Sequence, residues 1–158
     1  MYFAELDENY QTSTRITAAI QRVLGTHSAA AHSPRRAASG PTAILVAEND
    51  DRQRLIAKTA LEHSGYAVVL AENGAEAVAL LRNDEPHIAL VVVDRAALGS
   101  SAGETIRKLK SICPNVLILV SHARGENATA DSRAAGSIEK PFSAMPLAAA
   151  VEKALAAK

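Results

Sequence analysis

The sequence has little cysteine, few aromatic residues and no excess of either charge. Its single cysteine, Cys113, cannot form an internal disulfide or a cysteine-rich zinc site. Seventeen Lys and Arg balance seventeen Asp and Glu, so no overall positive field is available to collect nucleic acid or anionic lipid. We therefore expect a protein of a reducing, cytoplasmic compartment that does not bind nucleic acid.

Long apolar runs and a basic leader are also missing. No run approaches the roughly 18 residues needed to cross a bilayer, and the start, MYFAELDEN, is acidic where a secretory signal would be basic. We expect no contact with a membrane. The 158 residues give room for one ordinary domain plus an appendage.

The appendage is expected at the N-terminus. Residues 26–41 carry small residues, prolines and a glycine but no large apolar side chain, which predicts a linker. Before it, apolar residues at helical spacing predict one short helix from about Ser13 to Gly25; a frayed leader without function is an equal alternative. We therefore divide the chain into an extension, residues 1–40, and a domain, residues 41–158.

From residue 42 onward, short apolar runs alternate with segments of helical period. The runs are residues 42–47, 67–71, 88–93 and 116–120, with a very short one at 137–139. The expected helices are about 51–64, 74–83, 103–111, 126–135 and 143–157. Continuous apolar runs are typical of parallel strands covered on both faces. The pattern predicts an α/β fold, a doubly wound sheet of five parallel strands.

Polar side chains follow these strands at the edge where ligands bind in such sheets. They are Glu48, Asn49, Asp50 and Asp51 after the first strand, Asp94 after the third, Ser121 after the fourth, and Lys140 with Pro141 after the fifth. Each alone has a plain structural explanation, such as a helix cap, a turn residue or a solvated charge. Together they indicate one site.

At these residues the chain resembles the receiver domain of two-component response regulators. ILVAEND is similar to the family's first strand and acidic pair, AENGAEAVALL to its second strand-to-helix junction, and IEKPF to its fifth-strand ending. Residues 86–103, PHIALVVVDRAALGSSAG, match its third strand and loop. The resemblance covers about residues 42–157 and implies the flavodoxin-like strand order 2-1-3-4-5.

The resemblance also implies roles for the site residues. Asp94 would be the phosphoacceptor, with Lys140 and Ser121 binding the phosphoryl group, and the Lys140–Pro141 bond would be cis. The metal would be Mg²⁺, the one cofactor implied, held by Glu48, Asn49 and Asp94. Such a protein is not an enzyme; it takes the phosphoryl group from a histidine kinase or phosphotransfer protein. We expect a single-domain regulator that signals to a downstream protein partner through residues 126–157.

Three positions depart from the family pattern. Asn49 stands where an acid usually binds the metal, so we expect weak Mg²⁺ binding. Ser137 replaces the usual aromatic switch residue, and Leu98 replaces a proline. Asn49 and Ser137 favour an alternative, a pseudo-receiver that acts as a phosphorylation-independent interaction module. The retained Asp94, Ser121 and Lys140 favour the phosphorylated regulator. A flavin-binding protein or small enzyme on the same fold is disfavoured, because acids stand where a glycine-rich phosphate turn would be needed.

Overall fold

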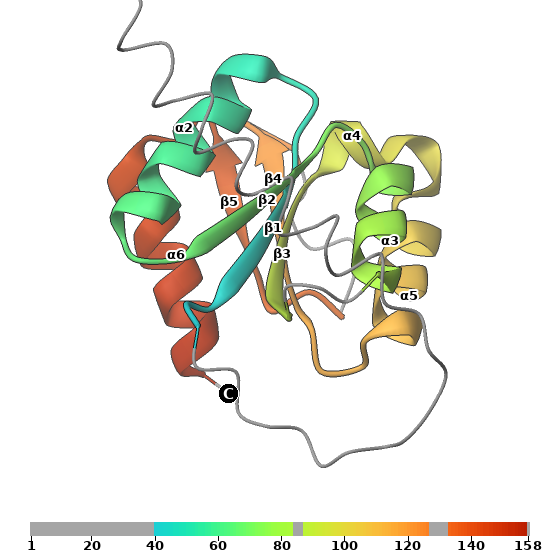
Figure 1. Ribbon diagram of the computed structural model, residues 1–158. Coiled ribbons are helices and arrows are strands. Elements are labelled where there is room, and N and C mark those ends of the chain that lie inside the picture. The colour runs from blue at the N-terminus through green and yellow to red at the C-terminus, as the bar shows by residue number, and fades with distance from the viewer. Residues whose placement is uncertain (1–39, 84–86, 127–132, 158) are drawn as a thin grey trace, which may run out of the picture. The chain divides into compact units, whose positions relative to one another are not determined.

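The computed structural model describes residues 40–83, 87–126 and 133–157. The elements, in chain order, are β1 (Ala43–Ala47), α2 (Asp51–His63), β2 (Ala67–Ala71), α3 (Gly74–Arg82), β3 (Ile88–Asp94), α4 (Arg95–Leu98), η1 (Gly99–Ser101), α5 (Ala102–Ile112), β4 (Leu117–Ala123), β5 (Gly136–Lys140) and α6 (Ala144–Ala156) (Figure 1). The N-terminal helix and linker predicted above, and residues 127–132 of the helix predicted at 126–135, lie outside the described residues.

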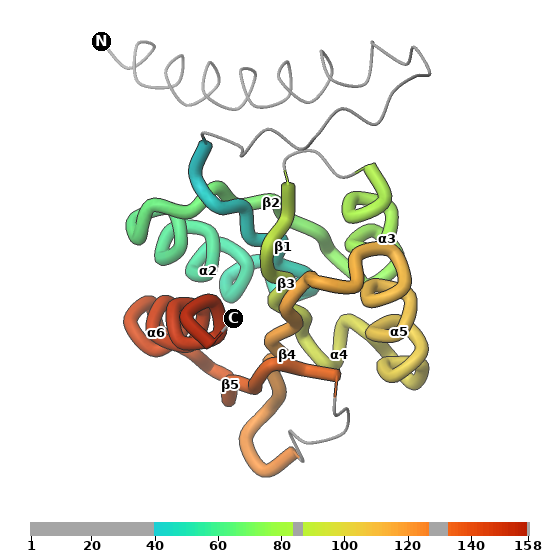
Figure 2. Tube along the Cα trace, turned by 90° about the horizontal axis from the view of Figure 1, so that it is seen from below, coloured from blue at the N-terminus to red at the C-terminus, as the bar shows by residue number. Residues whose placement is uncertain are grey.

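The five strands form one parallel sheet in the order β2-β1-β3-β4-β5, which confirms the predicted fold class and order. Helices α2 and α6 cover one face of this sheet, and α3 and α5 cover the other (Figure 2). Parallel crossovers are right-handed, so the reversal of strand order beside β1 places helices on both faces of the sheet. Each face therefore has its own apolar core.

The continuous apolar runs explain which strands lie at the centre. All five residues of β1 are buried, and β3 is buried along almost its whole length. In β5, at the sheet edge, only Ile138 is buried. A central strand needs apolar side chains on both faces, whereas an edge strand with one covered face does not.

Capping side chains set where two helices begin. The Asp50 carboxylate accepts hydrogen bonds from the backbone N–H groups of Arg52 (2.9 Å) and Gln53 (3.0 Å) at the start of α2. Asn73 accepts one from Glu76 N (2.9 Å) at the start of α3. Both were expected from the preference of Asp and Asn for N-cap positions.

Three strands extend further than the apolar pattern predicts, and one of them is β5, which runs from Gly136 to Lys140. β3 includes Asp94 and β4 continues to Ala123, because the hydrogen-bonded ladder continues past the last apolar residue. The short helix α4 directly after β3 is not predicted by periodicity. It is too short to show a period, and Asp94 caps it by accepting from Ala97 N at 3.3 Å.

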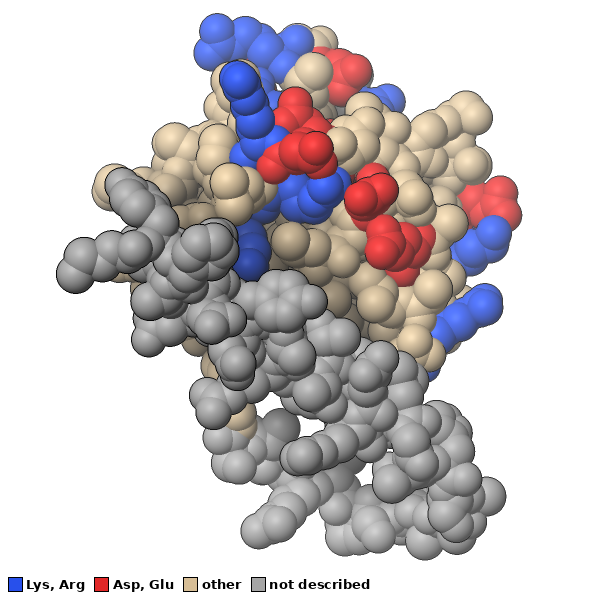
Figure 3. Space-filling model, turned by 45° about the horizontal axis from the view of Figure 1, so that its top comes forward, with Lys and Arg blue, Asp and Glu red and all other residues tan. Residues whose placement is uncertain are grey.

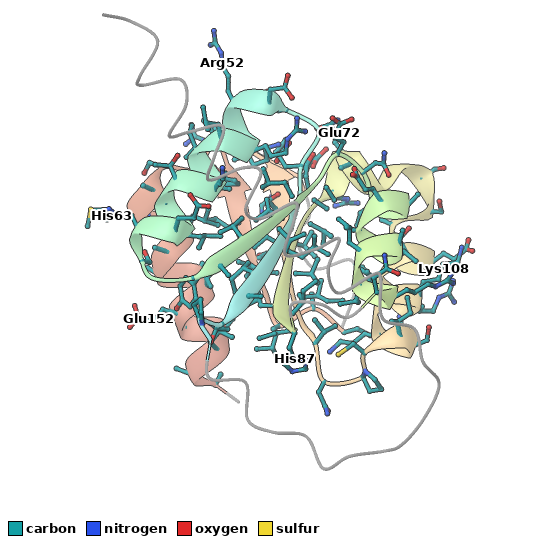
Figure 4. The ribbon with its side chains drawn as sticks, in the orientation of Figure 1. Arg52, His63, Glu72, His87, Lys108 and Glu152 are labelled. Atoms are coloured by element: carbon teal, nitrogen blue, oxygen red, sulfur yellow. The ribbon has the colours of Figure 1, made fainter. Side chains whose placement is uncertain are left out.

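The carboxyl ends of the strands meet at one edge of the sheet. Arg52, in the first turn of α2, and Glu72, directly after β2, lie at this edge, whereas His87 before β3 lies at the opposite edge (Figure 4). Among the helices described, none has the length and apolar character to cross a membrane.

Gly74 is the point where α3 comes closest to the segment after β3. A Cβ atom at this position would lie 3.0 Å from both Leu98 Cδ2 and Thr105 Cγ2. We expect Gly74→Ala to lower the free energy of unfolding by about 1 kcal/mol, because overpacking outweighs the gain in helix propensity. Urea unfolding of both proteins measures this difference.

The β-branched Thr105 provides the control, because its methyl group stays fixed while the end of Leu98 can move. Thr105→Ser removes that methyl and keeps the hydroxyl, so Gly74→Ala should cost less in the Thr105→Ser background. An unchanged or increased stability of Gly74→Ala alone would contradict the tight packing.

Candidate functional site

Asp94 ends β3 at the centre of the sheet's carboxyl edge. The residue is only 2% exposed, and its Oδ2 accepts the Ala97 N–H bond that caps α4. A buried carboxylate keeps its charge only when cations or hydrogen-bond donors face it. Asp94 therefore depends on the groups around it.

Lys140, the last residue of β5, supplies the opposite charge. Its Nζ lies 2.8 Å from Glu48 Oε2 and 3.4 Å from Asp94 Oδ1. Burial opposes the charge of the ammonium group, but the two carboxylates outweigh this effect and raise the pKa of Lys140 above its usual 10.5. The Lys140–Pro141 peptide bond is cis, as the resemblance implied.

Glu48, the residue directly after β1, pairs with Lys140 and is the third member of the charged group formed with Asp94. It is 2% exposed, and its Oε1 accepts a hydrogen bond from Asp50 N at 2.9 Å. Its carbonyl accepts one from Arg54 Nη1 at 2.8 Å, and Arg54 also pairs with Asp51. Arg54 escaped the sequence reasoning, since an arginine on an amphipathic helix normally suggests only a solvated face.

Ser121 lies on β4 directly across the ladder from Asp94. It is 1% exposed, and its Oγ finds no hydrogen-bond partner among the described residues. Leaving a buried hydroxyl unpaired costs about 1–3 kcal/mol. Such a group next to a charged site indicates a position where a ligand oxygen can bind.

A hollow of about 340 Å³ opens beside these groups. Its lining consists of Asp50, Gln53, Asp94, Ala96, Ala123, Glu126, Lys140 and Pro141. At this edge, acidic and basic side chains lie next to one another (Figure 3). Gln53 and Glu126 were missed because a helix and a loop bring them to the site, and the sequence search followed strand ends.

The residues predicted as metal ligands are placed differently from one another. Glu48 and Asp94 are buried and share Lys140, whereas Asn49 is exposed and the neighbouring Asp50 lines the hollow instead. Backbone hydrogen bonds, first from Gln53 N–H, lower the pKa of Asp50 below its usual 3.8 despite the opposing effect of desolvation. Asp50 is thus ionised at neutral pH.

The donor set suits a hard cation. Within the described ranges, no three acidic, histidine or cysteine side chains cluster to hold a metal by themselves. Mg²⁺ does not need such a cluster, because it keeps several waters and is usually held by one or two carboxylates and a phosphate. Glu48 and Asp94 fit this requirement, whereas the structure gives no contact that ties the exposed amide of Asn49 to them.

Lys140 keeps two buried carboxylates compatible with folding. We expect Lys140→Met to lower the free energy of unfolding at pH 7 by about 2 kcal/mol or more, since it leaves Glu48 and Asp94 without their cation. The loss should shrink in acid, because protons then neutralise both carboxylates and remove the need for the cation.

Urea unfolding at several pH values measures this loss, with Lys108→Met as the control. Lys108 pairs with Glu104 on the exposed face of α5, where a surface ion pair contributes below about 1 kcal/mol. A difference between Lys140→Met and the wild type that does not vary with pH would argue against the charge explanation.

Known proteins resemble the chain in both sequence and fold. Response regulator MprA of Mycobacterium sp. (strain KMS) is 34% identical over 106 residues, which cover 65% of this chain and 45% of that protein. Sensor kinase CckA of Brucella abortus (strain 2308) is 28% identical over 121 residues, 74% of this chain and 13% of the kinase. The chain thus spans less than half the length of these curated relatives.

Solved structures agree with this result. A response regulator from Thermotoga maritima superposes with a TM-score of 0.65 at 28% identity, covering 73% of this chain and 98% of that one. A receiver domain protein from Clostridium thermocellum gives the same TM-score at 22% identity, which shows the shared fold, and covers 73% of this chain and 95% of that one.

A family model for the response regulator receiver domain matches residues 44–152, well over half of the chain. This match includes β1 through most of α6 and hence every strand end that contributes to the site. The chain therefore belongs to the response regulator receiver domain family, signalling modules that interact with histidine kinases or phosphotransfer proteins and generally bind Mg²⁺ at their phosphorylation site.

Proposed function

We propose that Asp94 accepts a phosphoryl group from a histidine kinase or phosphotransfer protein, and that the chain then signals through a protein partner. One observation carries this proposal: the buried Ser121 hydroxyl lies across the ladder from Asp94 and has no partner among the described residues. A phosphoryl oxygen on Asp94 would supply the missing acceptor.

The transfer needs a nucleophile and compensation for negative charge. A carboxylate oxygen of Asp94 forms the new bond to phosphorus as the bond between phosphorus and the donor breaks, and the donor keeps that electron pair. Lys140 is near enough to Asp94 to donate to a phosphoryl oxygen. Glu48, Asn49 and Asp94 would hold Mg²⁺, and the chemistry that this ion supplies is neutralisation of the phosphoryl charge.

The new contacts also supply a route for signalling. Lys140 is now held by Glu48 and Asp94, and a phosphoryl group would compete with both for its ammonium. Bonds from Ser121 and Lys140 to the phosphoryl group would form only after transfer, so they favour any arrangement of β4 and β5 that shortens them. Partner contacts through the segment 126–157 are proposed on this basis.

Phosphorylation is tested by incubating the chain with Mg²⁺ and acetyl phosphate and measuring the intact mass. We expect the wild type to gain one phosphoryl group and Asp94→Ala to gain none, because the nucleophile is missing. Asp51→Ala is the control. Asp51 is an exposed acid that follows β1 at the same edge of the sheet, so this variant should gain the same mass as the wild type.

Two outcomes would oppose the proposal. Gain of a phosphoryl group by Asp94→Ala would show that another residue is modified. A folded wild-type protein that gains none, with Mg²⁺ and donor in excess, would support the pseudo-receiver interpretation instead.

The residue at position 49 determines how many anionic ligands the proposed Mg²⁺ site has. We expect Asn49→Asp to bind Mg²⁺ about tenfold more tightly than the wild type, because it adds an anionic oxygen ligand for a hard cation. Calorimetric titration with Mg²⁺ measures the two affinities.

Asn115→Asp is the matched control, because it adds the same charge at an exposed residue before β4, at the opposite edge of the sheet. It should leave Mg²⁺ affinity unchanged. Equal affinities of the wild type and Asn49→Asp would exclude position 49 from the ligands.

A further inference from the structure

The hollow beside Asp94 is poor in hydrogen-bond donors. Three of its lining side chains are carboxylates, those of Asp50, Asp94 and Glu126, and three more carry no polar group. Among the lining residues, only Lys140 and Gln53 have side-chain N–H groups. The Ala123 backbone N–H is already bonded to Glu126 Oε2 at 3.1 Å.

A phosphoryl group on Asp94 needs more donors than Lys140 provides. It brings a charge of about −1.5 to −2 and three strong acceptor oxygens. Lys140 is shared between Glu48 and Asp94, and Ser121 offers one hydroxyl. Together with Mg²⁺ they would give each oxygen one partner, but each phosphoryl oxygen accepts more than one bond, so acceptor positions would still face the lining of the hollow.

Gln53 is the lining residue with an uncommitted donor. Its Oε1 is buried without a hydrogen-bond partner. Outside the helical ladder, its one recorded hydrogen bond to a described residue is made by the backbone N–H, so the Nε2–H groups are available to a ligand. Its backbone is nevertheless fixed, because Gln53 N donates to Asp50 Oδ1 at 3.0 Å in the cap of α2. A neutral amide in this state is held at the hollow and remains unsatisfied.

We infer that Gln53 is a further phosphoryl-binding residue, whose Nε2–H donates to a phosphoryl oxygen on Asp94. This inference rests on the proposed phosphorylation of Asp94. The amide adds a donor without adding a second positive charge, so it leaves the hollow accessible to a divalent cation. It binds only the phosphorylated state, because Asp94 and Lys140 already satisfy each other before transfer.

The test uses beryllofluoride, a phosphoryl mimic that binds a carboxylate in the presence of Mg²⁺, with affinity measured by calorimetry. Gln53→Met keeps the length of the side chain and removes its donor, so we expect about tenfold weaker binding, as for loss of a hydrogen bond to a charged group. Gln53→Glu keeps the shape but adds a negative charge, and it should bind more weakly still.

Two controls separate this role from others. Thr59→Val makes a polar-to-apolar change at an exposed position further along α2 and should bind beryllofluoride like the wild type. Asp94→Asn should bind none, because the acceptor carboxylate is gone. Thermal unfolding without beryllofluoride should be the same for Gln53→Met and the wild type.

The outcomes distinguish the inference from the proposed function. Wild-type affinity in Gln53→Met, with no binding by Asp94→Asn, would overturn the inference and leave phosphorylation of Asp94 standing. Binding by Asp94→Asn would overturn the proposed function itself. Weaker binding by Gln53→Met that is accompanied by a matching loss of thermal stability would show a structural role and also reject the inference.

Discussion

The placement of one ammonium group between two buried carboxylates determines the rest of the site. Glu48 and Asp94 come from neighbouring strands, and Lys140 comes from the edge strand β5. Burying two carboxylates without a cation that faces them is strongly unfavourable. The parallel order of the sheet brings all three residues to one edge, so the topology and the charge balance depend on each other. The order of the strands is therefore part of the chemistry as well as of the fold.

Much of this arrangement could be predicted from the sequence, because it depends on strand ends. Continuous apolar runs mark the central strands, and the residues that follow them, such as Glu48 and Asp94, must meet at the same edge. Gln53 could not be found in this way, because its place in the lining of the hollow depends on how the first turn of α2 faces it. The direction of Asn49 depends on local backbone angles that the pattern does not specify. The periodicity of apolar residues predicts which segments form helices and strands, whereas the orientation of a single side chain depends on how those elements pack.

The edge strand β5 shows how a departure from the family pattern changes the coupling. Ser137 is exposed and has no ring that could move into the sheet. The ring on the neighbouring strand is His122, which directly follows Ser121, is 7% exposed and has its Nδ1 3.0 Å from Ala123 O. In the ladder, Ser121 pairs with Ile138 and Ala123 with Lys140. If phosphorylation displaces Ser121 as proposed, the displacement would reach β5 through this backbone pairing, which is less adjustable than a rotating side chain.

The charges at the site also bear on the stability of the phosphorylated state proposed above. Before transfer, two buried carboxylates face one ammonium group, while Asp50 is exposed and its charge is screened by solvent. Phosphorylation would replace the single negative charge of Asp94 with about −1.5 to −2 on the phosphoryl group, in a place that already has a deficit of positive charge. Neutral donors such as Ser121 can orient its oxygens, but they cannot cancel that charge. The proposed phosphorylated state should therefore become more stable as the concentration of divalent cation rises. With the neutral amide of Asn49 in the proposed ligand set, this should require a higher concentration than a second acid would.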